Sequence, residues 1–540
     1  MQTFFIRLAF VFAALGTAAA QQVVLPDTSN LNPEILSSGA RAWLLGPEFT
    51  PAAAAAAQAR ATPSFGTNVD AADPQEDLAA GQSETSIAAS GTHVLAAWND
   101  ATGFFVQPST LLRASLTGVS ISNDSGATFR DLQGLPNDNP LMQWMGDPTV
   151  RTIEANHFIV SSLYLPSRIG CNVVGRRLLA AAVSIATVAD DGSVRFTLPI
   201  IAVSGGDPCD FRSGPSFIDK TWISYDPNSR TLAMSYTRFG RFPAFGTGQI
   251  EMVRAFVPDD PTALNASLFS APILIQPDEQ NVVNQGSYVA LAPGGDAYIA
   301  WERNFGSNRG NGDPFVYIRA AVVPQGATAP SVGGPDSPRV VTLEQVNSNG
   351  IGGVKSLNTV PIPGYNRGPG NDFPRIAFRP SPDTSLPDQV IVVWNDASLH
   401  PLGDIWLRAL TPTLDFDTPI QKVNDDDSYA LHFLPALSVL DDGSISTSWY
   451  DRRIGGADSA KTDYFGEIRP AADQDAVDFR ITTGSTDWLG TGSLITPNFG
   501  DYTDNFSQGS STFYLWTDGR IGVPQPFADT SDNAIAAQTP

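Results

Sequence analysis

From Gln82 onward, short runs of β-branched, aromatic and other apolar residues alternate with clusters of Gly, Pro, Asn and Asp. This texture is typical of many short strands joined by turns. Long stretches with the helical period of apolar residues are absent. The pattern therefore predicts one all-β domain over residues 82–540.

One hairpin design recurs along this domain. Each copy has a polar or acidic start, a short apolar strand, a Gly/Asp turn and a second strand ending in an aromatic residue with polar residues after it. The seven copies are Glu84–Asp100, Gly146–Pro166, Ile218–Phe239, Gln285–Asn304, Asp372–Asp396, His432–Arg453 and Gly500–Arg520. Their anchor aromatics are Trp98, Tyr164, Tyr236, Trp301, Trp394, Trp449 and Trp516.

A four-stranded sheet cannot bury both of its faces alone, whereas sheets stacked radially can. We therefore expect a β-propeller of seven four-stranded blades, with the anchor aromatics packed between blades. Six blades with an appended hairpin is the alternative. In the last blade, Asn533–Gln538 is a candidate third strand, and the N-terminal region could supply the strand that closes the ring.

The first twenty residues predict a signal peptide. Arg7 supplies a positive charge, Leu8–Leu15 is apolar, and Ala18, Ala19 and Ala20 precede Gln21 as a cleavage site. Residues 21–81 are expected to be a leader or linker segment. No later stretch reaches the roughly eighteen apolar residues of a membrane-spanning helix. We expect a secreted or periplasmic protein without membrane insertion.

Cys171 and Cys209 are the only cysteines. In an oxidising compartment we expect them to form a disulfide, with two free buried thiols as the alternative. The chain has 32 Lys and Arg against 55 Asp and Glu, a net charge of -23. Such a charge repels phosphate backbones, so nucleic acid is not an expected partner.

The segment from Ser122 to Phe129, Ser-Asn-Asp-Ser-Gly-Ala-Thr-Phe, matches the Asp-box pattern Ser-x-Asp-x-Gly-x-Thr-Trp. Together with the aromatic-x-Asp-Arg endings, it makes the chain resemble a secreted member of the sialidase-like propeller superfamily over roughly residues 82–540. The resemblance implies a structural turn in which Ser122, Asp124, Gly126 and Phe129 hold their family positions. The Arg-Ile-Pro signature of sialidases is absent, and Pro374-Arg375-Ile376 is a different arrangement.

In a propeller, the loops before each innermost strand and after each second strand open on one face. Candidate acids and bases in these loops are Asp147, Asp219, Asp372 and Asp501. Tyr502 or Tyr450 could act as a nucleophile if a carboxylate such as Glu302 draws its proton. Guanidinium groups pair bidentately with carboxylates, so a cluster of arginines would indicate an acidic sugar as ligand. The candidate arginines are Arg238, Arg303, Arg375 and Arg452.

Each of these residues has a structural alternative, because such an Asp can cap a turn or pair with an Arg between blades. The four histidines, His93, His157, His400 and His432, lack zinc-ligand spacing. Asp425, Asp426 and Asp427 could bind a structural calcium ion or form a solvated turn. No cofactor is otherwise expected.

These observations favour a secreted, glycan-active protein, with a sialidase-like glycoside hydrolase acting on an acidic sugar as the first hypothesis. A non-catalytic propeller that binds a glycan or a surface protein is the second, because fold alone does not decide function. A polysaccharide lyase is the third.

Overall fold

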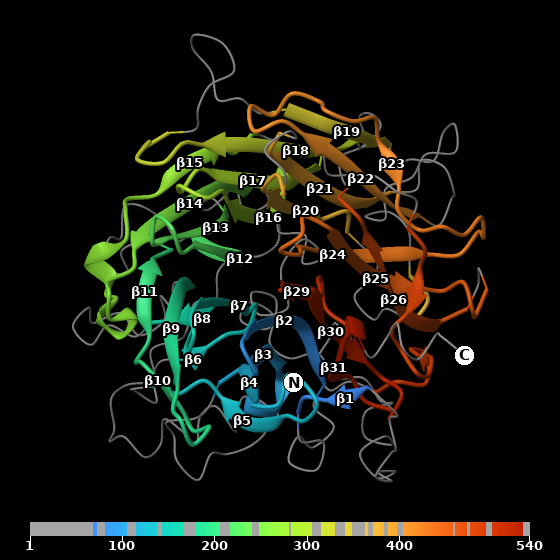
Figure 1. Ribbon diagram of the computed structural model, residues 1–540, viewed down its shortest axis with the longest axis horizontal. Helices are drawn as coiled ribbons and strands as arrows, with labels where there is room; N and C mark the ends of the chain where they lie inside the picture. The colour runs from blue at the N-terminus through green and yellow to red at the C-terminus, as the bar shows by residue number, and fades with distance from the viewer. Residues whose placement is uncertain are drawn as a thin grey trace, which may run out of the picture.

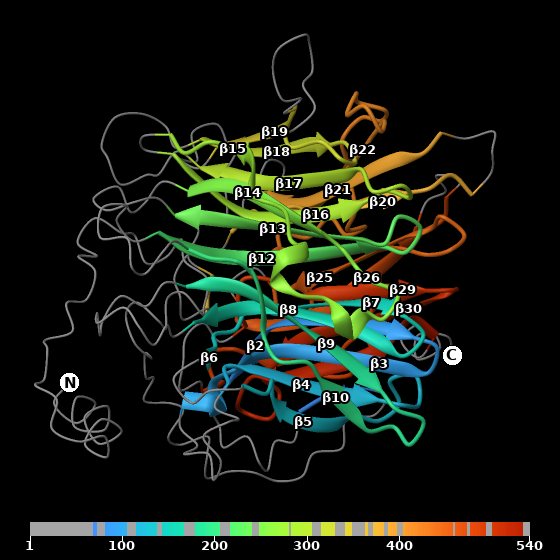
Figure 2. The ribbon, with the colours of Figure 1, turned by 90° about the vertical axis from the view of Figure 1, so that its left-hand side faces the viewer.

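The computed structural model describes residues 68–72, 81–104, 115–137, 143–166, 179–205, 216–239, 248–279, 282–304, 315–329, 341–347, 362–364, 371–382, 387–396, 403–456, 459–471, 476–492 and 499–532. These residues form seven antiparallel sheets around one axis, and Figure 2 shows the same ring from the side (Figures 1 and 2). The expected seven-bladed propeller is confirmed, and the six-bladed alternative is wrong. Among the described residues, no helix is long and apolar enough to cross a membrane.

The sheets are numbered here as blades 1 to 7 in chain order, and each is given from its innermost strand outward. Blade 1 is β2 (Gln82–Ser90), β3 (His93–Asp100), β4 (Thr117–Ser122) and β5 (Arg130–Gly134). Blade 2 has an interrupted innermost strand, β6 (Gln143–Trp144) and β7 (Thr149–Glu154), then β8 (His157–Leu165), β9 (Ala180–Val188) and the outer pieces β10 (Val194–Phe196) and β11 (Ile200–Val203). Blade 3 is β12 (Phe217–Asp226), β13 (Thr231–Phe239), β14 (Gly248–Phe256) and β15 (Ile273–Gln276).

The remaining blades repeat this order. Blade 4 is β16 (Val283–Leu291), β17 (Ala297–Asn304), β18 (Phe315–Val323) and β19 (Val341–Asn347). Blade 5 is β20 (Arg375–Arg379), β21 (Gln389–Asp396), β22 (Asp404–Leu410) and β23 (Gln421–Lys422). Blade 6 is β24 (His432–Val439), β25 (Ile445–Asp451), β26 (Lys461–Arg469) and β27 (Phe479–Arg480), with β28 (Thr486–Asp487) also paired to β26. Blade 7 is β29 (Asp504–Gln508), β30 (Ser511–Asp518), β31 (Gln525–Thr530) and β1 (Val69–Asp70).

Strand β1 closes the ring as the outermost strand of blade 7. Val69 pairs with Ala528 and Asp70 with Phe527, so the two ends of the propeller chain meet in one sheet (Figure 1). The third strand of this blade is β31, not Asn533–Gln538, which lies outside the described residues. The expected signal peptide also lies outside them.

The seven anchor aromatics all lie on second strands and are buried. They pack between neighbouring blades, as in the stack of Tyr464 in blade 6 on Trp516 in blade 7, whose centroids are 5.3 Å apart. Trp301 and Trp394 likewise share one apolar cluster that joins blades 3, 4 and 5. Because large aromatic side chains bury the most apolar area, these contacts hold the blades together.

The segment from Ser122 to Phe129 forms a compact turn between β4 and β5. Asp124 accepts hydrogen bonds from the backbone N–H and the hydroxyl of Thr128 at 2.9 and 2.6 Å, and from the hydroxyl of Ser122 at 2.7 Å. Ser122 Oγ in turn accepts from the backbone of Gly126 at 2.8 Å, and Phe129 packs against the core between blades 1 and 7. Asp124 is thus engaged with its own turn.

Candidate functional site

The innermost strands share an irregularity at one place. In blades 1, 3, 4 and 6 the pairing with the second strand skips two residues near the start of the innermost strand, and in blade 2 that strand is interrupted there. Such bulges re-aim a side chain. The first residue of each bulge has a left-handed backbone, and these residues are Glu84 (φ 55°), Asp147 (φ 57°), Lys220 (φ 53°), Gly286 (φ 64°) and Leu434 (φ 52°).

Side chains from this position meet at the centre of the ring. Each of these left-handed residues lies two positions before the next residue of its strand that pairs with the second strand. By the same count, Phe373 of blade 5 and Tyr502 of blade 7 hold this position. Lys220 Nζ lies 4.7 Å from the ring centroid of Tyr502 and 5.7 Å from that of Phe373. The Phe373 ring lies against Gly286, where an added Cβ would be 2.2 Å from it. The innermost strands that bring these residues together surround the axis in Figure 1.

Lys220 binds acidic groups of two other blades. Its Nζ lies 2.8 Å from Oδ2 of Asp501 in blade 7 and 3.6 Å from Oε1 of Glu84 in blade 1. All three side chains are buried, and a buried charge is stable only when it is paired. We call Glu84, Asp147, Lys220, Asp501 and Tyr502 the axial group.

Glu84 and Asp147 are joined across blades 1 and 2 by Asn99, which donates to Glu84 Oε2 at 2.7 Å and accepts the backbone N–H of Asp147 at 2.6 Å. Burial, followed by the negative charge of Glu84, raises the pKa of Asp147 well above its ordinary value, although Lys220 acts against this. Glu84 accepts hydrogen bonds from Asn99 Nδ2 at 2.7 Å and from the backbone N–H of Asp501 at 3.3 Å, which favour its ionised form. The raised pKa of Asp147 favours its protonated form.

The other two candidate aspartates are buried beside the axial group. Asp219 accepts a hydrogen bond from Gln285 Nε2 at 2.9 Å. Asp372 accepts from Asn395 Nδ2 at 3.1 Å and donates its backbone N–H to Glu302 Oε2 at 3.0 Å. The neighbouring Asn371 donates its amide to the backbone oxygen of Asp501 at 3.1 Å. The structure thus brings all four candidate aspartates to the centre of the ring.

Both candidate tyrosines keep their protons. Tyr502 donates to the backbone oxygen of Pro148 at 3.0 Å, and burial, with the charges of Asp147 and Glu84, raises its pKa well above the ordinary value. Tyr450 donates to the backbone oxygen of Thr517 at 3.0 Å and accepts from its N–H at 2.8 Å, and burial raises its pKa as well. Tyr450 therefore joins blades 6 and 7, and neither phenol is placed as an aryl-oxide nucleophile.

The four candidate arginines do not form one cluster. Arg238 binds Glu251 at 2.9 Å within blade 3, where the Tyr236 hydroxyl donates to the same carboxylate at 2.7 Å. Arg303 pairs with Glu279. Arg452 donates to Thr462 Oγ1 and to the backbone oxygen of Ser459 within blade 6. These three side chains are held inside their own regions and do not converge on a carboxylate ligand.

Arg375 alone of the four lies at the axis. Its guanidinium carbon is 3.7 Å from the ring centroid of Tyr288 and 5.2 Å from that of Trp222, and Nη2 donates to the backbone oxygen of Thr503 at 3.0 Å. Burial lowers the pKa of Arg375 to about 9. This side chain joins blades 3, 4, 5 and 7 and fills the axis beside the axial group.

The acidic run and His432 form ion pairs between blades 5 and 6. His432 Nε2 lies 3.1 Å from Asp426 Oδ1 and 3.4 Å from Asp451 Oδ2. Burial acts to lower the pKa of His432, but these two carboxylates outweigh it and raise the pKa. Asp425 pairs with Arg453 at 3.0 Å. Among the described residues, no group of three or more potential ligands is arranged to hold a metal ion. The expected disulfide partners, Cys171 and Cys209, lie outside the described residues.

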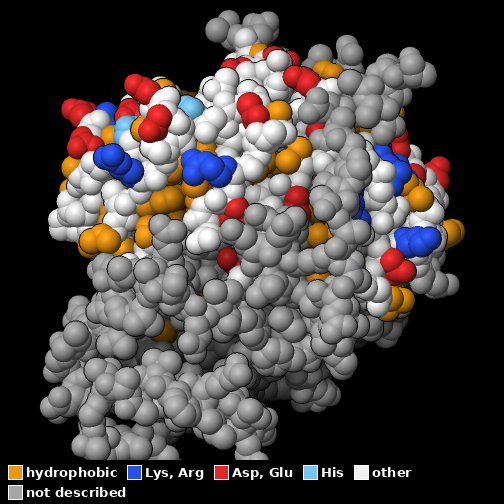
Figure 3. Space-filling view, turned by 90° about the horizontal axis from the view of Figure 1, so that it is seen from below, with side chains coloured by type: hydrophobic (Ala, Val, Ile, Leu, Met, Phe, Trp, Pro, Cys, Tyr) orange, Lys and Arg blue, Asp and Glu red, His pale blue; other side chains and the backbone are white. Residues whose placement is uncertain are grey.

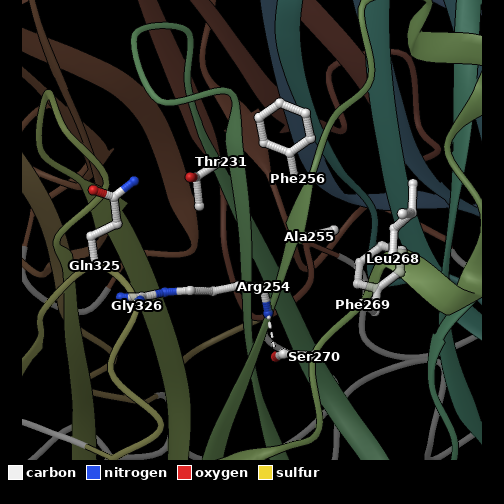
Figure 4. Close-up of a pocket in the computed structure, with 9 residues that line it drawn as sticks. All are labelled: Thr231, Arg254, Ala255, Phe256, Leu268, Phe269, Ser270, Gln325 and Gly326. Carbon is white, nitrogen blue, oxygen red and sulfur yellow. Dashed lines mark hydrogen bonds between the residues drawn. The ribbon is translucent and has the colours of Figure 1, made fainter.

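A pocket of about 450 Å³ lies away from the axis, on the outer side of blades 3 and 4 (Figure 4). Arg254, the half-exposed Phe256 and Ser270 line one side of it, and Gln325 and Gly326 the other. Arg254 also donates to the backbone oxygens of Val323 and Pro324, which ties blade 3 to blade 4. On the face in Figure 3, acidic, basic and apolar side chains are interspersed. The pocket shares no residue with the axial group.

Comparisons with known proteins find similar propellers among solved structures. An alpha-L-arabinanase of Penicillium chrysogenum bound to arabinobiose is 12% identical, with 72% of this chain and 94% of that chain covered and a TM-score of 0.41. A mutant alpha-L-arabinofuranosidase of Fusarium graminearum bound to an iminosugar inhibitor is 13% identical, with 76% and 98% covered and a TM-score of 0.42. A mutant sialidase of Trypanosoma rangeli displaying trans-sialidase activity is 9% identical, with 88% of this chain but only 59% of that chain covered and a TM-score of 0.42.

No protein-family model matches the chain, and no curated protein matches it. The assignment of the propeller fold is based on the seven sheets of this chain.

Three residues of the site were not among the sequence-based candidates. These are Glu84 and Asn99, near the two ends of the first predicted hairpin, and Lys220, which directly follows the candidate Asp219. Their importance follows from the bulge, which turns Glu84 and Lys220 toward the residues of other blades. Glu84 and Lys220 could have been found from the sequence as polar residues that stand two positions before an innermost strand begins its regular pairing.

Proposed function

We propose that this protein is a glycoside hydrolase that acts at the axial group. The observation that carries the proposal is the placement of two buried acidic residues around Lys220: Asp147 accepts its backbone N–H at 3.3 Å, whereas Asp501 is ion-paired with its Nζ at 2.8 Å. Burial also raises the pKa of Asp147 well above its ordinary value. Glycoside cleavage needs a proton donor and an ionised carboxylate at one bond. Environments that separate the protonation of two carboxyl groups are typical of acid and base assignments.

In the proposed reaction, Asp147 gives its proton to the oxygen of the leaving sugar. As the bond from the anomeric carbon to that oxygen breaks, Asp501, which is ion-paired with Lys220, stabilises the positive charge that develops on the sugar ring. Asp501 either takes a proton from a water molecule that attacks the anomeric carbon, or forms an ester with that carbon that water then cleaves, so that one water is consumed in either route. Glu84 stays ionised beside Asp147, because Asn99, Lys220 and the backbone of Asp501 stabilise its charge.

The charges at the axis favour a neutral sugar as substrate. Glu84 and Asp501 lie against Lys220, and two of the arginines expected to bind a carboxylate, Arg238 and Arg303, pair with Glu251 and Glu279 instead. Arg375 lies at the axis but is buried between the rings of Tyr288 and Trp222. A sugar carboxylate would be repelled by this acidic surrounding. The acidic-sugar hypothesis and the polysaccharide-lyase hypothesis, which both need a cation for the substrate carboxylate, are therefore less well supported. The protonated state of Tyr502 also disfavours it as a lyase base.

A non-catalytic propeller is the second candidate function, and one observation favours it. The side chains of Glu84, Asp147, Lys220 and Asp501 are all nearly fully buried and engaged with one another. A network of this kind can serve to join blades 1, 2, 3 and 7 without any chemistry.

The two candidates are separated by comparing the wild type with Asp147→Asn and Asp501→Asn on neutral arabinans and galactans, on sialosides and on uronate polymers. We expect turnover of a neutral glycan by the wild type and a loss of at least 100-fold in kcat in each variant, the range of general acid–base catalysis. Asp463→Asn, which changes a buried aspartate paired with Arg480 in blade 6, is the control and should keep its activity. Full activity in both axial variants, or turnover of none of the glycans, would favour the scaffold.

A further inference from the structure

Asn99 and Asn395 have the same structural role in two different blades. Each stands near the end of a second strand, in β3 and β21. The amide oxygen of Asn99 accepts the backbone N–H of Asp147 in the next blade at 2.6 Å. The amide oxygen of Asn395 accepts the backbone N–H of Leu434 in the next blade at 3.2 Å. Both asparagines therefore connect a blade to the bulge residue of its neighbour.

The amide nitrogens of the two asparagines differ in their partners. Asn99 Nδ2 donates to Glu84 Oε2 at 2.7 Å, whereas Asn395 Nδ2 donates to the backbone oxygen of Asn371 at 2.9 Å and to Asp372 at 3.1 Å. Asn99 alone of the two contacts both members of the carboxyl pair, Glu84 through its carboxylate and Asp147 through its backbone. When two carboxyl groups lie close together, a hydrogen bond donated to one of them favours the ionised form of that group.

The Glu84 carboxylate also has more contacts that stabilise a negative charge than the Asp147 carboxyl group has. The Glu84 carboxylate accepts from Asn99 and from the backbone of Asp501, and it lies 3.6 Å from Lys220 Nζ. The Asp147 carboxyl accepts the backbone N–H of Lys220 at 3.3 Å. Among the contacts that stabilise a negative charge on Glu84, the bond from Asn99 is the shortest.

We propose that Asn99 is a positioning residue that holds the Glu84 carboxylate and the bulge residue Asp147 in place across blades 1 and 2, and that its amide stabilises the negative charge of Glu84. The proposal rests on the proposed function, because that reaction uses the proton of Asp147 beside an ionised Glu84. Asn99 itself touches no substrate in this proposal, and it acts through the two carboxyl groups.

The backbone is shaped to admit this arrangement. A Cβ at Gly146 would lie 2.5 Å from Asn99 Oδ1, and a Cβ at Gly500 would lie 2.3 Å from Glu84 Cγ. Both glycines have left-handed backbones, with φ of 86° and 75°. Side chains at these two positions would push Asn99 and Glu84 out of contact, so the glycines leave room for the bond from Asn99 to Glu84.

The test compares Asn99→Leu with the matched control Asn395→Leu. Both variants lose an inter-blade hydrogen bond, so both should lower the melting temperature. Only Asn99→Leu should lower kcat/KM, by about tenfold, because loss of a hydrogen bond to a charged group disfavours the ionised form of Glu84 beside Asp147. Only Asn99→Leu should move the acid limb of the pH profile, upward by about one pH unit. Equal effects of the two variants on kcat/KM and on the pH profile would overturn the proposal.

A second measurement does not need turnover. The 13C NMR signals of aspartate and glutamate carboxyl carbons report protonation directly, with Asp147→Asn and Glu84→Gln used to assign them. At about pH 7 we expect Asp147 to be protonated and Glu84 ionised in the wild type, and Asn99→Leu to shift both signals toward intermediate values. Unchanged signals would overturn the role of Asn99. Shifted signals in a protein that cleaves no glycan would uphold that role and count against the proposed function alone.

Discussion

Glu84 and Asp147 are joined across the boundary between blades 1 and 2 by Asn99, which donates to the Glu84 carboxylate at 2.7 Å and accepts the backbone N–H of Asp147 at 2.6 Å. Both residues hold the left-handed position of a bulge, with φ of 55° and 57°. In blade 4 the same position is Gly286, which adopts this backbone without strain. For other residues a left-handed backbone costs roughly 1–2 kcal/mol, and such strain gathers at functional sites. The two acidic residues stand where stability alone would favour glycine.

The first prediction concerns this strain. Asp147→Gly and Asp147→Ala lose the same carboxyl contacts, but only glycine relieves the left-handed backbone. We expect the glycine variant to be more stable than the alanine variant by about 1 kcal/mol in urea unfolding. At Ala89, in the regular part of the innermost strand of blade 1, Ala89→Gly should instead destabilise the protein by roughly 0.5–1 kcal/mol. The same order of glycine and alanine at both positions would show that the bulge carries no strain.

The second prediction concerns the charge balance of the axial group. Lys220→Met leaves the buried carboxylates of Asp501 and Glu84 without their cation, and we expect it to cost about 3–5 kcal/mol in urea unfolding. Adding Asp501→Asn to this variant should restore part of that loss, because the two residues are coupled. Lys422→Met is the control, since its carboxylate partner Asp427 is fully exposed and its other hydrogen bond is to the backbone oxygen of Asp426, and it should change stability by no more than about 1 kcal/mol. Strictly additive effects of the two axial substitutions would contradict the pairing.

The fold could be predicted because its signal repeats. Each of the seven anchor aromatics ends an apolar run, and such a residue must be buried whatever the loops do. The sequence predicts that the N-terminal region supplies the closing strand but not which residues form it, because a strand of two residues, Val69–Asp70, is too short to show an alternating pattern. Their place in blade 7 is decided by pairing with β31 and by the side chain of Asn68.

The site could be predicted only in part, because strand register is not visible in the sequence. The four aspartates reach the axis since the blade topology brings the start of every innermost strand to the centre. Arg238 instead binds Glu251, a partner on the adjacent strand β14 that register alone brings within 2.9 Å. The direction of Glu84 and Lys220 depends on a bulge of two residues, and neither residue type marks a bulge by itself.

The third prediction concerns closure of the ring. Asn68 is buried and donates to the backbone oxygen of Ile481 at 2.9 Å and to Asp529 at 2.8 Å, and it accepts the N–H of Thr483 at 2.7 Å. Asn68→Ala should lower the free energy of unfolding by roughly 2–3 kcal/mol, because buried polar partners are left unsatisfied. Hydrogen exchange should speed up most in β31, next to β1. Equal acceleration in β13 of blade 3 would show that Asn68 has no special part in closure.

The fourth prediction concerns pH and the contact between blades 5 and 6. Burial, followed by the hydrogen bond to Asp425, raises the pKa of Asp478 from 3.8 to about 7 in the folded protein, against the opposing effect of Arg453. Because the folded protein binds this proton more tightly than the unfolded chain, the resulting stability is present at low pH and is lost as the pH rises through about 7. Asp478→Asn keeps a neutral side chain in this place. Its melting temperature should therefore fall less than that of the wild type between about pH 5 and pH 8, whereas Asp463→Asn, in the same blade, should keep the wild-type slope. A wild-type slope in Asp478→Asn would mean that other groups, such as His432, account for the pH dependence, since the pKa of His432 is also raised and acts with the same sign.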